Sequence, residues 1–242
     1  MAIAQINCFN KPLQKEVGFL ALLPDRQDAP GPYPVCYLLH GLSDDYTAWL
    51  RWTSLERYVR DVPLIVVLPD GDRGWYSDMA DGAAYETALL EGLIPFVDRY
   101  LPTVASGSGR AIGGLSMGGY GAMKLALKHP EMFCSVAGHS GAYDVVGNNE
   151  SGIPAQDCCF FLAEKLVKSE APAIRFDCGR DDFLIEQNRK FHAHLEKLGI
   201  AHEYDEFAGT HDWGYWDEHI QQAIGFHCRA LGLDEMSAPQ VK

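Results

Sequence analysis

The sequence RAIGGLSMGGYGAMKLALK, at residues 110–128, decides the fold. The residues before Ser116 form a short apolar run typical of a buried strand, and those after it have the spacing of a helix. Gly114-Leu115-Ser116-Met117-Gly118 lies between them and matches the G-x-S-x-G pattern. A residue at the tip of such a strand-to-helix turn has a strained backbone, and glycines two residues to either side remove steric collisions. The stretch therefore predicts a tight turn that presents Ser116 as a nucleophile at the N-terminus of a helix.

Short apolar runs alternate with longer amphipathic runs along the rest of the chain, a pattern typical of strands connected by helices. The middle apolar runs are continuous, as in strands covered on both faces, so we expect an α/β protein with a mostly parallel sheet. The predicted strands are Val17–Leu23, Val35–His40, Leu64–Leu68, Ala111–Leu115, Ser135–His139, Ala173–Cys178 and His202–Phe207. The predicted helices are Thr53–Asp61, Ala84–Tyr100, Met117–Lys128, Ile185–Leu198 and Trp216–Leu231.

The domain organisation is expected to be simple. No repeat, low-complexity segment or Ser/Gly-rich linker interrupts the pattern, so we expect one domain over residues 1–232. Residues 233–242 carry little apolar pattern and are expected to fray. The segment Val145–Cys159 is polar, contains glycine and proline, and follows a predicted strand, so we expect it to form a short cap over the functional site.

Composition and charge exclude several classes of partner. The 242 residues include 20 basic and 33 acidic ones, for a net charge of −13, which disfavours nucleic acids and anionic membranes because both attract positive charge. The seven cysteines show no Cys-x-x-Cys pair or zinc-like spacing, so no metal is expected. No run approaches the ~18 apolar residues of a membrane span, and no signal-peptide pattern is visible. A cytoplasmic location is the expectation.

A serine hydroxyl is a weak nucleophile, so Ser116 requires a base, and the base requires a carboxylate that orients it. For a nucleophile in this kind of turn, the expected chain order is serine, acid, histidine. Eight histidines follow Ser116, and His211 differs from the others because it lies in AGTHDWGYW, between the last predicted strand and the last predicted helix. Such a loop lies at the carboxyl edge of the sheet, where ligands bind in open α/β folds. His211 is therefore the predicted base.

The acid is expected in the loop after the strand Ala173–Cys178, which offers two adjacent carboxylates, Asp181 and Asp182. The residues alone leave both open. A developing oxyanion needs two N–H donors, and we expect these to be the backbone amides of Met117, after the nucleophile, and of Leu42, in the loop after an earlier strand.

Other residues near these loops are candidates for structural roles or for lining the substrate pocket. His40, in His40-Gly41-Leu42, is expected to be a structural hydrogen-bonding residue and not a second base. Trp213 and Trp216 follow His211 closely and either form the wall of a substrate pocket or pack in the core.

Five motifs carry a family resemblance: YLLHGLSDDYTAW, GWYSDMADG, GGLSMGGYGAM, CGRDDFL and GTHDWGYW. In this order they resemble the esterase D-like esterases of the α/β-hydrolase superfamily, and most of all its short-chain acyl (tributyrin) and feruloyl-type esterases. The resemblance runs from about Val17 to Leu231. It implies the α/β-hydrolase fold, and it places the family's nucleophile, base and carboxylate on Ser116, His211 and Asp182.

The function implied by this resemblance is that of a serine carboxylesterase. It would hydrolyse short-chain acyl or aryl esters of small molecules through an acyl-enzyme, without a cofactor, and relatives of this type often form homodimers or homotetramers.

Three alternatives stay open: an S-formylglutathione thioesterase, an acyltransferase like the more distant antigen 85 mycolyltransferases, and a binding relative without turnover. S-formylglutathione hydrolases usually have a cysteine-containing stretch after the first oxyanion loop and a histidine before the nucleophile. This chain has GLSDDYTAW and Leu115 instead, which weakens the thioesterase reading.

Overall fold

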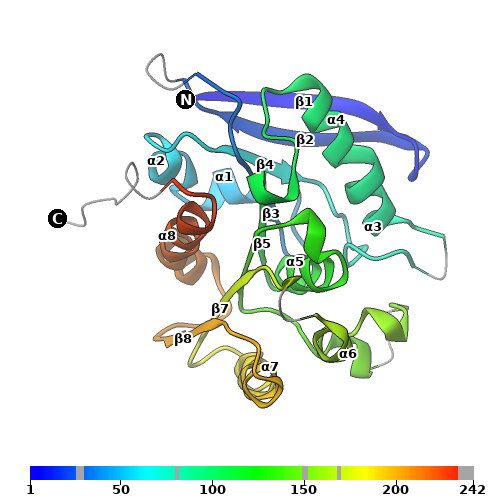
Figure 1. The fold of residues 1–242 in the computed structure, drawn as a ribbon, viewed down its shortest axis with the longest axis vertical. Coiled ribbons are helices and arrows are strands. Elements are labelled where there is room, and N and C mark those ends of the chain that lie inside the picture. Colours follow the sequence, from blue (N-terminus) through cyan, green and yellow to red (C-terminus); the bar gives the residue numbers. More distant parts are fainter. Residues whose placement is uncertain (26–29, 80–81, 149–151, 168–169, 234–242) are drawn as a thin grey trace.

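Eight strands form one sheet in the computed structural model, which describes residues 1–25, 30–79, 82–148, 152–167 and 170–233. Their spatial order is β1-β2-β4-β3-β5-β6-β7-β8 (Figure 1). The strands are β1 (Ala2–Asn10), β2 (Lys15–Leu23), β3 (Val35–Leu39), β4 (Ile65–Pro69), β5 (Arg110–Leu115), β6 (Ser135–His139), β7 (Ala173–Gly179) and β8 (Glu203–Phe207). β2 runs antiparallel to both β1 and β4, and all the other pairs are parallel.

Helices cover both faces of the sheet, so its carboxyl edge is left free for loops. They are α1 (Ala48–Trp52), α2 (Leu55–Val59), α3 (Tyr85–Thr87), α4 (Ile94–Tyr100), α5 (Met117–Lys128), α6 (Cys159–Lys165), α7 (Ile185–Leu198) and α8 (Trp213–Ala230). Figure 1 shows α1, α2 and α8 on one side of the sheet and α3 to α7 on the other. Each side has its own buried apolar cluster.

The predicted α/β-hydrolase architecture is confirmed, and the seven predicted strands and five predicted helices are present, with different bounds for several. The strand β1 and the helices α1 and α6 were not predicted. β1 is an antiparallel edge strand with many exposed residues, so it lacks the continuous apolar run that marks the central strands. The single helix predicted over Ala84–Tyr100 contains a six-residue π-helical segment, Ala88–Leu93, between α3 and α4.

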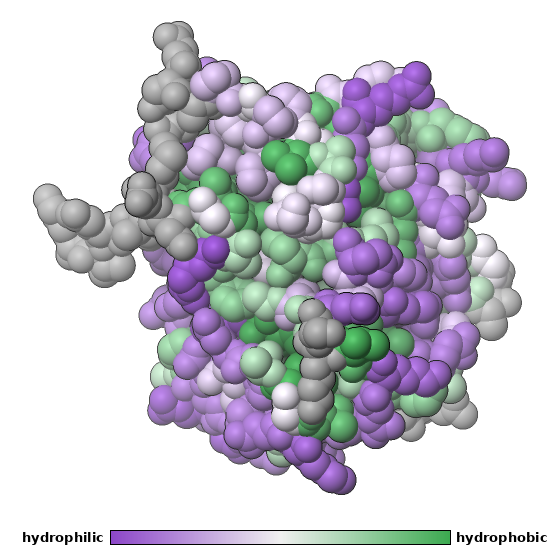
Figure 2. All heavy atoms as spheres, in the orientation of Figure 1, coloured by the Kyte–Doolittle hydropathy of each residue, from purple (hydrophilic) through white to green (hydrophobic). Residues whose placement is uncertain are grey.

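All seven cysteines are free. Within the described ranges, no helix is long and apolar enough to cross a membrane. Figure 2 shows hydrophilic side chains around the outline of one face and hydrophobic ones mainly toward its middle. The tail predicted to fray lies, from residue 234 onward, outside the described residues.

The turn between β5 and α5 has the strained geometry that its sequence predicts. Ser116 has φ 52° and ψ −115°, a backbone conformation that residues other than glycine rarely adopt. A Cβ atom on Gly118 would lie 2.5 Å from the carbonyl oxygen of Leu39 and 2.6 Å from that of His40. A Cβ atom on Gly114 would lie 2.6 Å from the backbone of Gly118. The two glycines therefore allow the first turn of α5 to lie directly against the end of β3.

We expect Gly118→Ala to lower the free energy of unfolding by about 2 kcal/mol or more, because the new methyl group meets backbone atoms that cannot rotate away. Gly225→Ala is the matched control, since Gly225 lies in α8 with open space around its Cβ position. That substitution is expected to raise stability by about 0.5–1 kcal/mol through helix propensity. The measurement is the free energy of unfolding of both variants in urea. An equal change in the two variants would contradict the packing argument.

A second prediction concerns His227 on α8, which is fully enclosed and contacts Ser135 Oγ at 2.8 Å through Nδ1. Burial, followed by the nearby charges of His139 and Arg175, lowers the pKa of His227 to about 3. The unfolded chain binds a proton at this residue below its ordinary pKa of about 6.5, whereas the folded protein does not until about pH 3. Stability from this residue is therefore lost as the pH falls through this window, at up to about 1.4 kcal/mol per pH unit.

The variant His227→Asn keeps a side-chain amide near the Nδ1 position but does not titrate. Its free energy of unfolding should fall less steeply than that of the wild type between about pH 6 and pH 4. His194→Asn, at a partly exposed position on α7, serves as the control for loss of a histidine. The measurement is urea unfolding of both proteins at each pH. An equal fall in the free energy of unfolding with pH for the wild type and His227→Asn would contradict the prediction.

Candidate functional site

Three side chains from three separate loops form one hydrogen-bonded series at the carboxyl edge of the sheet. His211 Nε2 lies 3.0 Å from Ser116 Oγ, and His211 Nδ1 lies 2.8 Å from Asp182 Oδ2. A carboxylate only accepts hydrogen bonds, so Nδ1 carries the hydrogen and Nε2 is left to accept one from the Ser116 hydroxyl. The structure thus brings together three residues predicted from sequence, which lie 66 and 29 positions apart along the chain.

The two adjacent carboxylates that the sequence left open differ sharply in their surroundings. Asp181 is exposed, whereas Asp182 is buried, and its second oxygen accepts a hydrogen bond from the backbone amide of Leu184 at 2.8 Å. Burial alone would raise the pKa of Asp182, but hydrogen bonds from His211, Leu184 and Ser140 outweigh it and lower the pKa below its usual value. Asp182 is therefore an anion at neutral pH, in contact with His211.

Aromatic rings surround the imidazole of His211. The ring of Trp216 meets it edge-on with 4.9 Å between centroids, and the centroid of the Phe183 ring lies 4.5 Å from that of the imidazole. Trp216 is buried and also donates from Nε1 to Ser140 Oγ at 3.3 Å, while Phe183 is 75% exposed. Trp216 thus combines the two roles left open for it, core packing and lining of the pocket. Phe183 was not predicted, because no sequence pattern distinguishes an aromatic residue at a pocket rim from one in the core.

A pocket of about 430 Å³ opens beside Ser116. It is lined by Gly41, Leu42, Ser43, Asp44, Leu115, Ser116, Phe183, His211, Asp212, Trp213 and Trp216. Among these described lining residues there is no lysine or arginine, and the charges at the wall come from Asp44 and Asp212. Burial raises the pKa of Asp44, whereas hydrogen bonds from Thr210 and from the amide of Tyr215 lower the pKa of Asp212. The pocket therefore combines aromatic and aliphatic side chains with two carboxylates in its lining.

The two residues predicted to supply oxyanion-binding amides, Met117 and Leu42, belong to the surroundings of Ser116. Met117 is the first residue of α5, where a helix leaves its N–H groups without intrahelical partners. Leu42 lines the pocket, and the Cβ position of the preceding Gly41 is 3.8 Å from Ser116 Cβ. Within the described part of the chain, neither amide donates to a backbone carbonyl in a turn, loop or cap.

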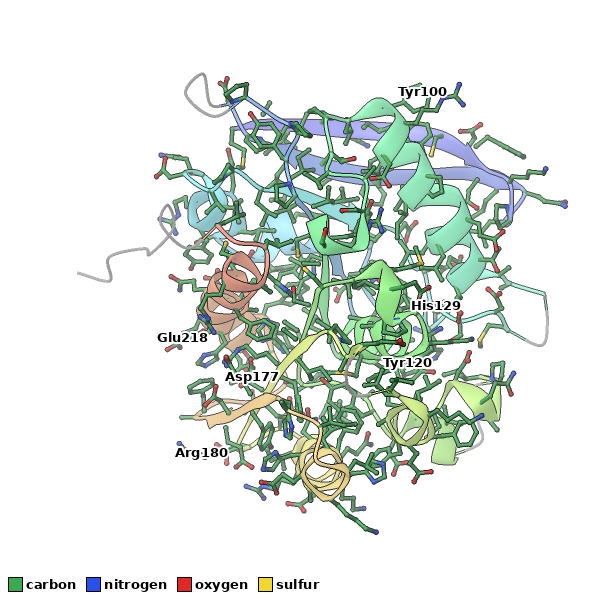
Figure 3. The ribbon with its side chains drawn as sticks, in the orientation of Figure 1. Tyr100, Tyr120, His129, Asp177, Arg180 and Glu218 are labelled. Carbon is green, nitrogen blue, oxygen red and sulfur yellow. The ribbon has the colours of Figure 1, made fainter. Side chains whose placement is uncertain are left out.

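The segment Val145–Cys159, predicted to be a cap, is fastened to α5. Its residues 149–151 lie outside the described ranges, and the rest includes the short 3₁₀ helices Val145–Asn148 and Ala155–Asp157. Tyr120 Oη donates to the Asp157 carbonyl at 2.9 Å, and Lys128 Nζ lies 2.7 Å from Asp157 Oδ1. Figure 3 shows Tyr120 between α5 and α6. No described residue of this segment lines the pocket beside Ser116.

A second polar layer lies beneath the site. Asp177, labelled in Figure 3 near α8, accepts hydrogen bonds from Tyr215 Oη at 2.8 Å and His139 Nδ1 at 3.1 Å. Both partners are buried. In the described part of the chain, no group of three or more His, Cys, Asp or Glu residues could hold a metal ion. What the arrangement offers chemically is a polarised hydroxyl, an imidazole that can accept its proton and a carboxylate that holds the imidazole.

The chain is similar to known esterases in sequence and in fold. A family model described as "Putative esterase" matches residues 11–227. An acetyl esterase of Caldicellulosiruptor saccharolyticus is 32% identical, over 93% of this chain and 97% of its own. Two solved structures from Staphylococcus aureus are each 28% identical. The fluorophosphonate-binding serine hydrolase FphF has a TM-score of 0.87 and is matched over 93% of this chain and 98% of that one. An S-formylglutathione hydrolase has a TM-score of 0.83, over 94% and 99%.

The family match and the acetyl esterase match cover nearly all of the chain that forms the sheet and the site. The two solved structures also share the overall fold of the chain over nearly its whole length. The chain therefore belongs to this esterase family, has the α/β-hydrolase fold, and is a carboxylic ester hydrolase.

Proposed function

We propose that the protein is a serine esterase that cleaves esters of short acyl groups through a Ser116–His211–Asp182 triad. The observation that carries this proposal is the hydrogen-bonded series in which His211 lies 3.0 Å from Ser116 Oγ and 2.8 Å from Asp182. Both distances are within ordinary hydrogen-bond range, so the proton of the hydroxyl has a defined acceptor.

In the first step, Ser116 Oγ attacks the ester carbonyl carbon while His211 Nε2 takes its proton. Asp182, held as an anion by its hydrogen bonds, stabilises the imidazolium that forms. The amides of Met117 and Leu42 bind the negative oxygen of the tetrahedral intermediate. His211 then gives its proton to the alcohol oxygen, the C–O bond breaks, and an acyl-enzyme remains.

In the second step, His211 takes a proton from water, and the hydroxide that results attacks the acyl carbon. The same two amides bind the second oxyanion. Ser116 leaves with the proton from His211, and the carboxylic acid is released. Every group used in this sequence is a side chain or backbone amide of the chain, so no cofactor enters the mechanism.

The size and lining of the pocket favour substrates with a small, uncharged acyl or aryl group. Its volume of about 430 Å³ is near the lower end of the usual range for ligand pockets. Trp213, Trp216 and Phe183 supply apolar surface beside the nucleophile. Asp44 and Asp212 place negative charge at the wall, which disfavours anionic substrates.

A thioesterase acting on S-formylglutathione is the second candidate, because one of the similar solved structures is such a hydrolase. The triad serves a thioester as well as an ester. Glutathione, however, carries two carboxylates, and the described lining of the pocket has no lysine or arginine to bind them. We therefore rank the oxygen ester first.

Replacement of the nucleophile tests the proposed function. We expect Ser116→Ala to lower kcat by about 10⁴–10⁶, because the covalent route is lost. The measurement is hydrolysis of p-nitrophenyl acetate, butyrate and octanoate and of S-formylglutathione by wild type and variant. We expect the wild type to prefer acetate and butyrate over octanoate and over the thioester.

The outcomes of this assay separate the candidates. A variant that keeps more than about a tenth of the wild-type rate would show that Ser116 is not the nucleophile. A wild type that prefers S-formylglutathione would select the second candidate. A folded wild type that turns over none of the four compounds would contradict both.

The neighbouring carboxylates form a matched pair for the role of Asp182. We expect Asp182→Asn to lower kcat by about 10⁴, because the amide no longer holds the required tautomer of His211. Asp181→Asn removes the same charge one residue earlier at an exposed position and should change kcat by less than about threefold. A larger loss in Asp181→Asn would assign the triad carboxylate to the other residue.

A further inference from the structure

His40 lies at the end of β3, directly before the loop that contains Leu42. Its side chain is 1% exposed, and both ring nitrogens have partners. Nδ1 lies 2.7 Å from the carbonyl oxygen of Gly41, and Nε2 lies 2.9 Å from the backbone nitrogen of Gly71. His40 does not line the pocket beside Ser116, so it has no part in the proton transfers described above.

These two contacts determine where the ring hydrogen is. A carbonyl oxygen can only accept, so Nδ1 must carry a hydrogen and donate it to Gly41. The amide of Gly71 can only donate, so Nε2 must present its lone pair. Asp70 Oδ1 is 3.5 Å from Nε2, a longer contact than the one from Gly71. The contacts therefore place a ring hydrogen on Nδ1 and make Nε2 an acceptor.

We propose that His40 is a positioning residue that orients the peptide between Gly41 and Leu42 so that the Leu42 N–H faces the oxyanion. In a trans peptide the C=O and N–H bonds point in opposite directions. His40, assisted by the amide of Asp44 at 3.2 Å, holds the Gly41 carbonyl away from the pocket. On the opposite side of the same peptide, the Leu42 N–H would then face the pocket that Leu42 and Ser116 both line. This inference rests on the proposed function.

Tyr76 holds His40 in turn. Its hydroxyl lies 3.0 Å from the His40 amide, which donates to it, and 3.3 Å from the His40 carbonyl, to which it donates. The ring of Tyr76 fits where two glycines leave space, since Cβ atoms on Gly71 and Gly121 would lie 2.3 Å and 2.5 Å from it. Tyr76 has φ 50° and is fully enclosed.

Helix α5 fixes this loop through Lys124, which is completely buried. Lys124 Nζ donates to the Tyr76 carbonyl at 2.5 Å, to Ser77 Oγ at 3.1 Å and to Glu86 Oε2 at 2.6 Å, so all three of its hydrogens are used. The helix that begins after the nucleophile therefore also sets, through Tyr76 and His40, the orientation of the second oxyanion donor.

Two amide variants separate the roles of the ring nitrogens. His40→Asn places an N–H group near the Nδ1 position and can still donate to Gly41, whereas His40→Gln places its amide near the Nε2 position and cannot. We expect His40→Gln to lower kcat on p-nitrophenyl butyrate by about 10² with KM within about threefold, as for loss of an oxyanion donor. His40→Asn should keep kcat within about tenfold of the wild type.

Affinity for a trifluoromethyl ketone provides the second readout, because its adduct with Ser116 carries an oxyanion. It should fall in His40→Gln by the same factor as kcat, while inhibition by butyrate, which forms no such adduct, stays unchanged. A role in folding alone would affect both variants alike and leave the ratio of the two affinities intact, and that result would overturn the inference. If His40→Gln does not fold, Tyr76→Phe takes its place, with an expected loss of about tenfold in kcat and in ketone affinity.

Failure of this inference is distinguishable from failure of the proposed function. A wild type that hydrolyses the ester and loses activity in Ser116→Ala, but whose two His40 variants have equal kcat, contradicts only the role of His40. A wild type without turnover contradicts the proposed function itself.

Discussion

The close contact between the first turn of α5 and the end of β3 is the constraint on which the rest of the site depends. Gly118 lies so near the carbonyls of Leu39 and His40 that no side chain fits between them. That contact places Ser116, at the start of α5, beside the loop that follows β3. A helix packed one side chain further away would separate Ser116 from Gly41 and Leu42. The spacing of glycines around Ser116 is therefore a requirement of packing between two elements and not only of the turn itself.

The same helix carries a buried charge network that ties its middle to the loop after β4. Burial of Lys124 lowers its pKa, and the nearby carboxylates of Glu86 and Asp157 oppose that effect. For Glu86, burial raises the pKa, but hydrogen bonds and charges from His129, Lys124 and Lys128 outweigh it and lower the pKa. A buried ion pair contributes little net stability unless its members are fully hydrogen-bonded, and Lys124 meets that condition. Such a network defines one arrangement of the loop against the helix.

The architecture could be predicted, and Ser116 could be proposed as the nucleophile, because both rest on local patterns. The bounds of α5 and α7 agree with the prediction. α5 begins directly after the turn at Ser116 and ends before Pro130, a residue that cannot continue a helix. α7 has an amphipathic run and ends at a left-handed glycine, Gly199. The choice of His211 followed from its place between a strand and a helix. The choice between Asp181 and Asp182 did not follow from the residues, because only the three-dimensional turn determines which carboxylate is buried.

Contacts between distant segments account for what the sequence left undetermined. β1 is defined by its pairing with β2 and not by an apolar run of its own. The aromatic surroundings of His211 combine Phe183 from one loop with Trp216 from α8, which no single motif indicates. His40 was expected to be a hydrogen-bonding residue, but the partner of each nitrogen becomes visible only when the loops after β3 and β4 are placed together.

Residues with a strained backbone lie mainly at the edge of the sheet that carries the site. Among the described residues, six that are not glycine have a positive φ: Gln14, Asp72, Trp75, Tyr76, Ser116 and Ser140. All but Gln14 lie in loops after β4, β5 and β6, at the edge of the sheet that carries the site. Each such residue costs about 1–3 kcal/mol and persists only where its surroundings determine it. Here the surroundings are named contacts: Lys124 on the Tyr76 carbonyl, and Trp216 on Ser140 Oγ. The strain therefore lies where the proposed oxyanion donors and the proposed nucleophile must be held in place before a substrate arrives, which is the condition for electrostatic stabilisation without reorganisation.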